Sequence, residues 1–558
     1  MMNPSKTDLN IMKKKSFIIA SALLAIPFGI GAQTADNDTI NRTVLVESVY
    51  NPVLSSSEKR SFLPEEEPVT TVRETVTYSE NYLEPTVWKR EPFAPGSMQL
   101  TPSGPRYGYA RLGYGTFNVV DAEGVAHFAL GQNDGIDVGI SGEGWKGKVP
   151  YGDDRWDGHQ RSIDARVNYI HTGNTSVCAS LDFGTYGHNY IANDSLSSRL
   201  TTSPLAFSYG AQVSVNGDIS DFSIDQPIEY TLRTGFHQWR NNCWQGFEQL
   251  NTEGHFEADL LLAYRLNANS HLRLNLHDDL LSYQLPGYDT YDAITATPQW
   301  TSTGDNWTAA VGLNVDIQTR GGSFLQLSPA CHFTYTAFDR IRLDLAVDGG
   351  RDLHTFADLY ALSPYWMSLA QLSQPYTFLN ARLHADARVM DGIHVGLKGG
   401  YRIIDNALFF SEDFTKGILF SRLDNHDAKV MTLGADASYA FTDYIRATAD
   451  LTLYKWDVGS DNLSLLAYAP KADANVNIRF TLLDNLHING GIRYILRNET
   501  AAGRVPSVFD VSAGADYAFN DRFSVYVKFD NLLSQRYSLY PGYPALGIHG
   551  LAGIIFKL

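Results

Sequence analysis

The feature that most constrains this chain is a sustained alternation of apolar and polar side chains that begins at Tyr107. In Tyr444–Trp456 one face carries Ile445, Ala447, Ala449, Leu451 and Leu453, and the other carries Arg446, Thr448, Asp450 and Thr452. The runs Lys471–Leu482, Phe509–Phe519 and Phe523–Phe529 alternate in the same way. Successive strand residues point to opposite faces, so these runs predict strands with one apolar and one charged face.

Soluble sandwiches also alternate, and three features separate the two interpretations. The runs span about 10–14 residues, whereas soluble strands average about five or six and membrane-spanning strands need about 9–11. Short and long connections also alternate, as in outer-membrane barrels. The short ones are Phe338-Asp339-Arg340, Met390-Asp391-Gly392, Phe441-Thr442-Asp443, Asp484-Asn485 and Asn520-Asp521, and the long ones are 352–374, 405–429 and 457–470.

Aromatic residues at the ends of these runs are the third feature. They are Phe441, Tyr444, Tyr454, Trp456, Phe519 and Phe523. A barrel places such residues in lipid-facing girdles. The sequence therefore predicts an all-β fold, a large antiparallel transmembrane barrel of the outer-membrane type.

Composition excludes the main alternatives. Spanning helices need about 20 consecutive apolar residues each, and no such run follows residue 31; the mean hydropathy is −0.21. Three widely spaced cysteines give no metal-type or redox-type pair. The net charge of −17 gives no reason to expect nucleic-acid binding.

Residues 1–32 have the pattern of an export signal. Lys13, Lys14 and Lys15 precede an apolar core from Phe17 to Ile30, followed by small residues. We expect a Sec-type signal peptide over 1–32 rather than an anchor helix, because the core is too short and wrongly flanked. Export places the chain in the outer membrane of a Gram-negative cell.

Residues 33–105 differ from everything after them. They hold eight of the 22 prolines and the acidic run Glu65-Glu66-Glu67. Proline cannot donate to a strand ladder, so we expect a Pro-rich periplasmic or lumenal segment, with one short strand at Thr43–Val49. The barrel is expected to fill 106–558.

The strand count depends on one segment. Asn306–Thr319 reads as a strand, which lies in a surface loop if the barrel has 20 strands or pairs with Ile294–Ser302 if it has 22. Even counts are expected because both ends should be periplasmic. Gly547–Leu558 is expected to close the barrel against the first strand, which leaves no unpaired edge in lipid.

The last hairpin carries a family resemblance. Phe529-Asp530-Asn531-Leu532-Leu533-Ser534-Gln535-Arg536-Tyr537, followed by Tyr540-Pro541-Gly542-Tyr543-Pro544, resembles the end of TonB-dependent receptors. Tyr50-Asn51-Pro52-Val53-Leu54-Ser55 is similar to a Bacteroidota group of receptor-like barrels that lack the usual plug domain. The resemblance implies 22 strands and a role in transport.

The chain departs from the receptor pattern before the barrel. Receptors carry a plug of more than a hundred residues, with a Gly-rich "R-G" run and a "V-D-G" loop, and 33–105 is shorter and has neither motif. Thr43–Glu47 is only faintly similar to a TonB box and reads better as an ordinary β-forming pentapeptide. We therefore do not expect engagement of TonB.

Candidate reactive groups are few. No H-x-H, H-E-x-x-H or G-x-S-x-G motif is present. In His277-Asp278-Asp279 the outer two share a face, which ordinary lumenal charge explains, and Asn425-His426-Asp427 reads as loop composition that could touch a cation. We predict no enzyme, no catalytic residues, no cofactor and no metal site, and the ligand-binding residues stay unknown.

Loop aromatics are the better recognition candidates. They are Tyr288, Tyr291, Tyr360, Tyr365, Trp366, Tyr537, Tyr540 and Tyr543. If exposed, they could stack on sugars or dock a partner; loops folded over the barrel mouth explain them equally well.

Two functions remain open at this point. One is transport of a large solute, with 33–105 or inward-folded loops filling the lumen. The other is a non-conducting structural subunit that docks a surface lipoprotein or assists barrel assembly. Outer-membrane lipids and the barrel-assembly machinery are the expected partners in both.

Overall fold

The computed structural model describes residues 108–192, 203–219, 228–242, 251–320, 323–338, 340–368, 371–415, 417–442, 444–500 and 503–558. The predicted signal peptide, the Pro-rich segment and the strand at Thr43–Val49 lie outside these residues.

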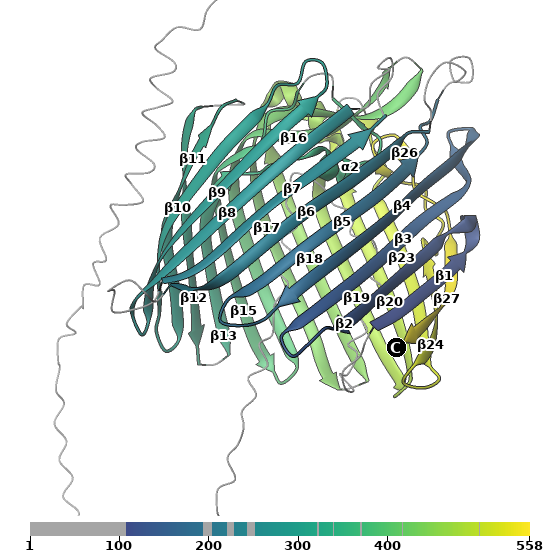
Figure 1. The fold of residues 1–558 in the computed structure, drawn as a ribbon. Helices are drawn as coiled ribbons and strands as arrows, with labels where there is room; N and C mark the ends of the chain where they lie inside the picture. Colours follow the sequence, from purple (N-terminus) through teal and green to yellow (C-terminus); the bar gives the residue numbers. More distant parts are fainter. Residues whose placement is uncertain are drawn as a thin grey trace, which may run out of the picture. The chain divides into compact units, whose positions relative to one another are not determined.

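The described residues form a closed antiparallel barrel of 22 strands (Figure 1). Its strands are β1 (Gly108–Gly115), β2 (Val120–Ala129), β3 (Asp134–Tyr151), β4 (Asp154–His171), β5 (Ser176–His188), β6 (Leu205–Ile219), β7 (Ile228–Asn241), β8 (Asn251–Asn267), β9 (Ser270–Gln284), β10 (Tyr291–Thr303), β11 (Trp307–Gln318), β12 (Leu325–Ala337), β13 (Ile341–Arg351), β15 (Tyr376–Met390), β16 (Ile393–Thr415), β17 (Ile418–Thr442), β18 (Ile445–Asp457), β19 (Pro470–Leu483), β20 (Leu486–Arg497), β23 (Val508–Ala518), β24 (Phe523–Asp530) and β27 (His549–Lys557).

The remaining elements lie in the connections. They are the 3-10 helices η1 (Thr116–Asn118) and η3 (Ser460–Ala467), the helix α2 (Phe356–Leu362), and the short strands β14 (Trp366–Met367), β21 (Glu499–Thr500), β22 (Gly503–Arg504), β25 (Ser538–Tyr540) and β26 (Tyr543–Pro544). No helix within the described ranges is both long and apolar enough to span a membrane.

The barrel closes between its first and last strands, as predicted. β1 pairs with β27 antiparallel from Tyr109↔Lys557 to Gly115↔Leu551. At the centre of this seam Gly113 faces Gly553, and a Cβ on either would lie 2.5 Å from the Tyr526 side chain. Both glycines therefore leave room for Tyr526 against the seam.

The count of 22 settles the alternative at Asn306–Thr319. β10 pairs with β11 from Ala293↔Gln318 to Thr303↔Thr308, so Ile294–Ser302 does pair with this segment. The predicted alternation also holds, because Leu451 and Leu453 on β18 are 43% and 45% exposed whereas Thr452 between them is 9% exposed. The exposed apolar face is the outside of the barrel, and the polar face lines the lumen.

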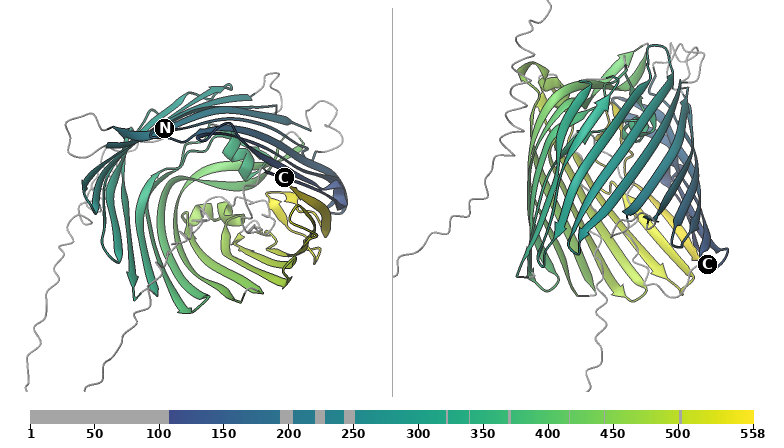
Figure 2. Two further views of the ribbon diagram at one scale, coloured as in Figure 1. Left: turned by 60° about the horizontal axis from the view of Figure 1, so that its bottom comes forward. Right: turned by 60° about the vertical axis from the view of Figure 1, so that its left-hand side comes forward.

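Two rims can be told apart by their connections. The predicted tight turns at 391–392 and 484–485 lie on the rim that also holds Gly108 and Leu558; we call it the turn side. The opposite rim, the loop side, carries longer connections such as 352–365 with α2 (Figure 2).

Two sequence predictions are wrong in this region. Residues 405–429 are not a long connection, because β16 continues to Thr415 and β17 begins at Ile418. Tyr454 is not in a lipid-facing girdle; it shares the inward face with Asp450 and is 9% exposed. In the first case the strands continue through residues whose composition resembles a loop. In the second, the alternation of β18 places Tyr454 on the same face as the polar residues.

Candidate functional site: the lumen wall and the aromatic roof

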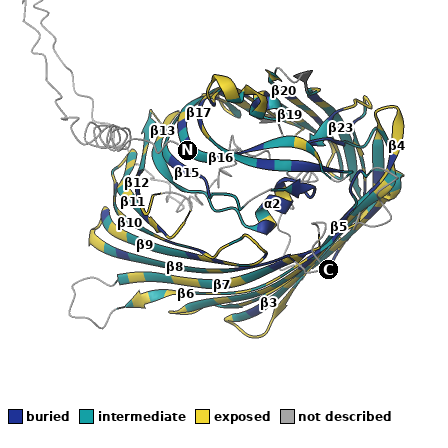
Figure 3. Cartoon of the chain, turned by 90° about the horizontal axis from the view of Figure 1, so that it is seen from above, coloured by how far each residue is buried: buried dark blue, intermediate teal, exposed yellow. Residues whose placement is uncertain are grey.

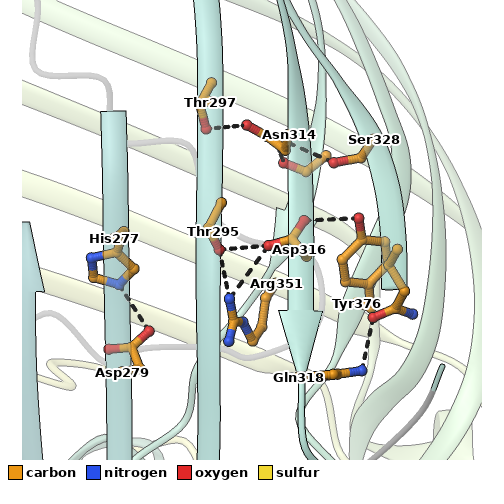
Figure 4. A network of polar contacts seen from close by, with 12 residues as sticks. His277, Asp279, Thr295, Thr297, Asn314, Asp316, Gln318, Ser328, Arg351 and Tyr376 are labelled. Atoms are coloured by element: carbon orange, nitrogen blue, oxygen red, sulfur yellow. Dashed lines mark hydrogen bonds and ion pairs between the residues drawn. The ribbon is translucent and has the colours of Figure 1, made fainter. Parts of the chain in front are cut away.

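The lumen wall between β9 and β15 is lined by polar contacts, with the His277–Asp279 contact on β9 separate from a larger network on β10 to β15 (Figure 4). At its centre Asp316 on β11 accepts hydrogen bonds from Thr295 at 2.6 Å and from Tyr376 at 3.0 Å. The Arg351 guanidinium lies 3.4 Å from the same carboxylate and donates to Thr295 at 2.6 Å. The side chains of Arg351 and Asp316 are 4% and 2% exposed, so this ion pair is buried within the wall.

The network continues along neighbouring strands in both directions. Tyr291 donates to Gln318 at 2.9 Å, and Gln318 donates to Gln326 at 2.8 Å. On the turn side of this group, Thr297 donates to Asn314 at 2.7 Å. Most of these polar groups satisfy one another, so the network reads as a rigid wall rather than as a vacant binding site.

The predicted His277-Asp279 pair belongs to this wall. The two side chains share the lumenal face and lie 2.8 Å apart, and Asp279 also contacts His255 at 2.9 Å. His277 contacts Asp259 at 2.6 Å. Across the described ranges, no three or more His, Cys, Asp or Glu side chains are grouped to hold a metal ion.

The loop side of the barrel is crossed by four segments that we call the roof. They are 189–192, 355–367 with α2 and β14, the end of the β16–β17 hairpin from 407 to 426, and 537–546 with β25 and β26. Seen from above, α2 lies inside the ring of strands (Figure 3). The roof is therefore built within the barrel mouth.

The β16–β17 hairpin reaches across the mouth because its pairing shifts. The register slips between Ile404 and Ala407, and Asn406 adopts a φ of 56°. Just beyond this point consecutive residues are buried on both faces, as Leu408 (1%) and Phe409 (3%) show. A strand in lipid would expose every second side chain, so this part of the hairpin is enclosed by protein.

Backbone pairing ties the four roof segments together. Leu419 donates its amide to Ile191 at 3.0 Å, and the amide of Ser421 donates to Tyr365 at 2.9 Å. The Ser421 hydroxyl donates to Pro541 at 3.2 Å. The hairpin is thus the element that the other three segments share.

Aromatic side chains fill the space between the roof and the wall. Tyr360 of α2 lies 5.1 Å from Trp239 on β7 and 5.5 Å from Tyr186 on β5, measured between ring centroids. Trp156 on β4 packs edge-on against Tyr543, with centroids 5.5 Å apart. These contacts belong to two buried clusters, one around α2 and one around the hairpin end.

The loop aromatics are therefore not exposed recognition groups. Tyr291, Tyr360, Tyr365, Trp366, Tyr537, Tyr540 and Tyr543 are between 1% and 8% exposed, and Tyr288 is partly buried against the cluster around α2. Burial raises the pKa of Tyr543 well above its usual value, so the phenol stays neutral and donates to the Leu419 carbonyl at 2.5 Å. Of the two interpretations left open by the sequence, the folded-in loops are correct.

The segment 425–427 also has a structural role. The Asn425 amide donates to the carbonyls of Ser373 and Asn406, at 2.9 and 2.7 Å. His426 contacts the Val458 carbonyl at 3.1 Å, and Asp427 accepts from the Asn406 amide at 3.1 Å. These side chains hold the hairpin and its neighbours rather than a cation. Only tertiary contacts reveal this, since the local sequence reads as a loop.

Comparison with known proteins bears on the fold. No protein-family model and no curated protein sequence matches the chain. Among solved structures, the ferric enterobactin receptor PfeA of Pseudomonas aeruginosa has 13% sequence identity and a TM-score of 0.61 over 81% of each chain. The copper transporter OprC has 11% identity and a TM-score of 0.61, over 81% of this chain and 80% of its own. The FrpB iron transporter of Neisseria meningitidis has 12% identity and a TM-score of 0.59 over 82% of each chain.

These likenesses define the class of fold. The chain has the 22-stranded barrel of outer-membrane receptors and transporters, and the similar structures that we compared are not enzymes.

Proposed function

We propose that the protein is an outer-membrane barrel of the receptor type that passes a large solute, with the roof as its gate. The single observation that carries this proposal is a wide barrel with a polar lumen whose mouth is crossed by the roof, which consists of three connecting segments and the end of the β16–β17 hairpin. A barrel of about 22 strands is wide enough to need an obstruction. Outer-membrane receptors and transporters share the fold, which supports the assignment to transport.

The orientation follows from the connections. Short turns face the periplasm and longer loops face the cell exterior in such barrels, so we place the roof on the outside. We also propose that residues 1–32 are a signal peptide. Residues 33–105 would form a Pro-rich periplasmic or lumenal segment in place of a plug domain, and TonB engagement is not part of the proposal.

Solute passage can be tested by liposome swelling with sugars of graded size. We expect slow swelling with the full chain and fast swelling when the roof hairpin is shortened, with an upper size limit set by the lumen. A variant that lacks 33–105 tests whether this segment is a second obstruction, because its removal would then make swelling faster. If every form excludes even the smallest sugar, transport through the lumen is wrong.

The dense packing of the roof also favours a second candidate, a closed structural subunit of an outer-membrane complex that docks a surface lipoprotein or assists barrel assembly. Buried aromatic clusters and shared backbone hydrogen bonds would suit a permanent lid. Affinity purification from native membranes in mild detergent tests it. Recovery of a stoichiometric lipoprotein or assembly subunit supports this candidate, and recovery of the barrel alone counts against it.

A further inference from the structure

The β3–β4 hairpin rises above its neighbours at the loop side. β3 and β4 have 18 residues each, whereas β1 and β2 have 8 and 10. β2 pairs with β3 only as far as Val120↔Gly144. The remainder of β3, from Trp145 to Tyr151, therefore stands beyond the end of β2.

The outward face of this hairpin changes from apolar to basic along its length. Its lower part exposes Ile140 (56%) and Ile163 (46%). Above them the same face carries Lys146, Lys148, Arg155 and Arg161, all exposed. In the orientation proposed above, such a change is expected where an outward face leaves the apolar band of a membrane and meets the lipid headgroups.

The cross-strand register brings these bases together. Lys146 faces His159, Lys148 faces Asp157, and Gly144 faces Arg161. Asp157 is the one carboxylate among the facing pairs from Gly144 to Lys148, so positive charge dominates this face. Within the described ranges, none of the four bases has an ion pair with a carboxylate. Charges left unpaired on a surface are available to an external partner.

The Arg161 side chain is held by glycines on both sides. A Cβ on Gly187 of β5 would lie 3.1 Å from Arg161 Nε and 3.5 Å from its Cγ, and a Cβ on Gly144 would lie 3.2 Å from its Cβ. The arginine stem therefore lies along the outer surface of the barrel, across the glycine of the next strand. An arginine guanidinium can form the planar, paired hydrogen bonds that suit phosphate.

We propose that Lys146, Lys148, Arg155 and Arg161 bind the phosphate groups of a phosphorylated glycolipid in the outer leaflet. The acyl chains would lie against the apolar band below, over Ile140 and Ile163. Basic residues next to a membrane surface attract anionic headgroups. The continuity of the basic face with the lipid-facing band favours a lipid over a soluble phosphate compound.

The test uses the full chain purified in detergent and native mass spectrometry. The probes are a diphosphorylated acyl glycolipid, the same lipid after dephosphorylation, and inorganic phosphate. The double variant K146Q/K148Q is compared with K429Q/K455Q, which removes two exposed outward lysines near the loop-side end of the β17–β18 pairing. The fourfold variant that adds R155Q and R161Q removes the whole basic face.

We expect the wild-type protein to retain the phosphorylated lipid and to bind the dephosphorylated lipid and inorganic phosphate much more weakly. The double variant should lose affinity about thirtyfold and the fourfold variant further, while K429Q/K455Q should match wild type. The charge-preserving variant K146R/K148R should also match wild type, which excludes misfolding as the cause. Equal binding by wild type and the fourfold variant, or equal losses in K146Q/K148Q and K429Q/K455Q, would overturn the proposal. Because lipid binding is measured without any flux, its failure leaves the transport proposal standing, and the reverse also holds.

Discussion

Tyr365 and Tyr543 stack face to face, with ring centroids 3.4 Å apart and ring planes 5° from parallel. Tyr365 follows α2, and Tyr543 lies in the connection before the closing strand, so the stack joins two roof segments from distant parts of the sequence. The hairpin end packs beside them, because the Tyr543 hydroxyl donates to the Leu419 carbonyl. This stack is the point at which the roof can be loosened with a single substitution.

Replacing Tyr543 with alanine should open the roof. The side chain is 1% exposed, and removing a buried aromatic ring costs about 3–5 kcal/mol of local packing free energy. We expect a higher rate of hydrogen exchange at 418–421 and a higher ion conductance. Tyr444→Ala is the matched control, because Tyr444 is 65% exposed and its loss should change neither quantity. Unchanged exchange in Tyr543→Ala would show that the stack does not hold the roof.

Glu253 on β8 should anchor α2 to the wall. Its Oε1 accepts a hydrogen bond from the Phe356 amide at 2.7 Å, and the residue is 2% exposed. Glu253→Ala leaves that amide without its acceptor, at a cost of about 1–3 kcal/mol. We expect protease cleavage within 355–367 that the wild-type protein resists.

A glutamine at position 253 tests whether the hydrogen bond to the Phe356 amide or the charge of the carboxylate holds α2. Glu253→Gln keeps a carbonyl oxygen at the same position and should protect α2 almost as well as glutamate. If Gln and Ala variants are cleaved equally fast, the hydrogen bond to Phe356 is not what holds the helix.

The buried Arg351–Asp316 pair predicts strong coupling in the wall. Arg351→Met leaves the Asp316 carboxylate without its cation, and breaking one partner of a buried pair costs about 3–5 kcal/mol. The double variant Arg351→Met/Asp316→Asn removes the uncompensated charge and should recover part of that loss. Thermal unfolding of the four proteins gives the coupling energy. Additive effects of the two substitutions would contradict a direct interaction.

Alanine substitutions at the two seam glycines, Gly113 and Gly553, should lower the yield of folded barrel to different degrees. A Cβ on Gly113 would meet the ends of the Tyr526 and Leu551 side chains at 2.5 and 2.8 Å, whereas a Cβ on Gly553 would also meet the backbone oxygen of Leu112 at 2.5 Å. Flexible side chains can move and backbone cannot, so Gly553→Ala should lower the yield of folded barrel more than Gly113→Ala. The yield can be read from heat-modifiable gel migration. Adding Tyr526→Phe should rescue Gly113→Ala in part and leave Gly553→Ala impaired.

The wall of the barrel could be predicted from the sequence because its information is local. Period-two alternation placed Leu451 and Leu453 outside, and the closing strand ending at Leu558 was identified from the same pattern. Loops folded over the barrel mouth were one of two alternatives that the sequence left open, and the contacts that decide between them could not be predicted. The burial of Tyr360 depends on Trp239 and Tyr186 from other strands, and no local pattern reports contacts across a barrel mouth.

The length of the β16–β17 hairpin could not be predicted from the local sequence either. Residues 405–429 contain charged and small side chains that read as a loop, yet pairing continues from Ala407↔His426 to Thr415↔Ile418. Leu408 and Leu423 then find apolar partners from α2 and the wall. Strand length there is decided by what the hairpin packs against.

We expect the roof, and above all the β16–β17 hairpin, to obstruct the lumen of the barrel. This obstruction is tested most directly by single-channel conductance in planar bilayers. The full chain is compared with a variant in which Leu408–Asn425 is replaced by an Asn-Gly turn, which keeps the Ala407↔His426 pair. We predict little or no conductance from the full chain and large, stable channels from the shortened variant. Large channels from the intact protein would show that the roof does not obstruct the lumen. Channels that stay closed after removal of the hairpin, in a chain that also lacks 33–105, would show the same.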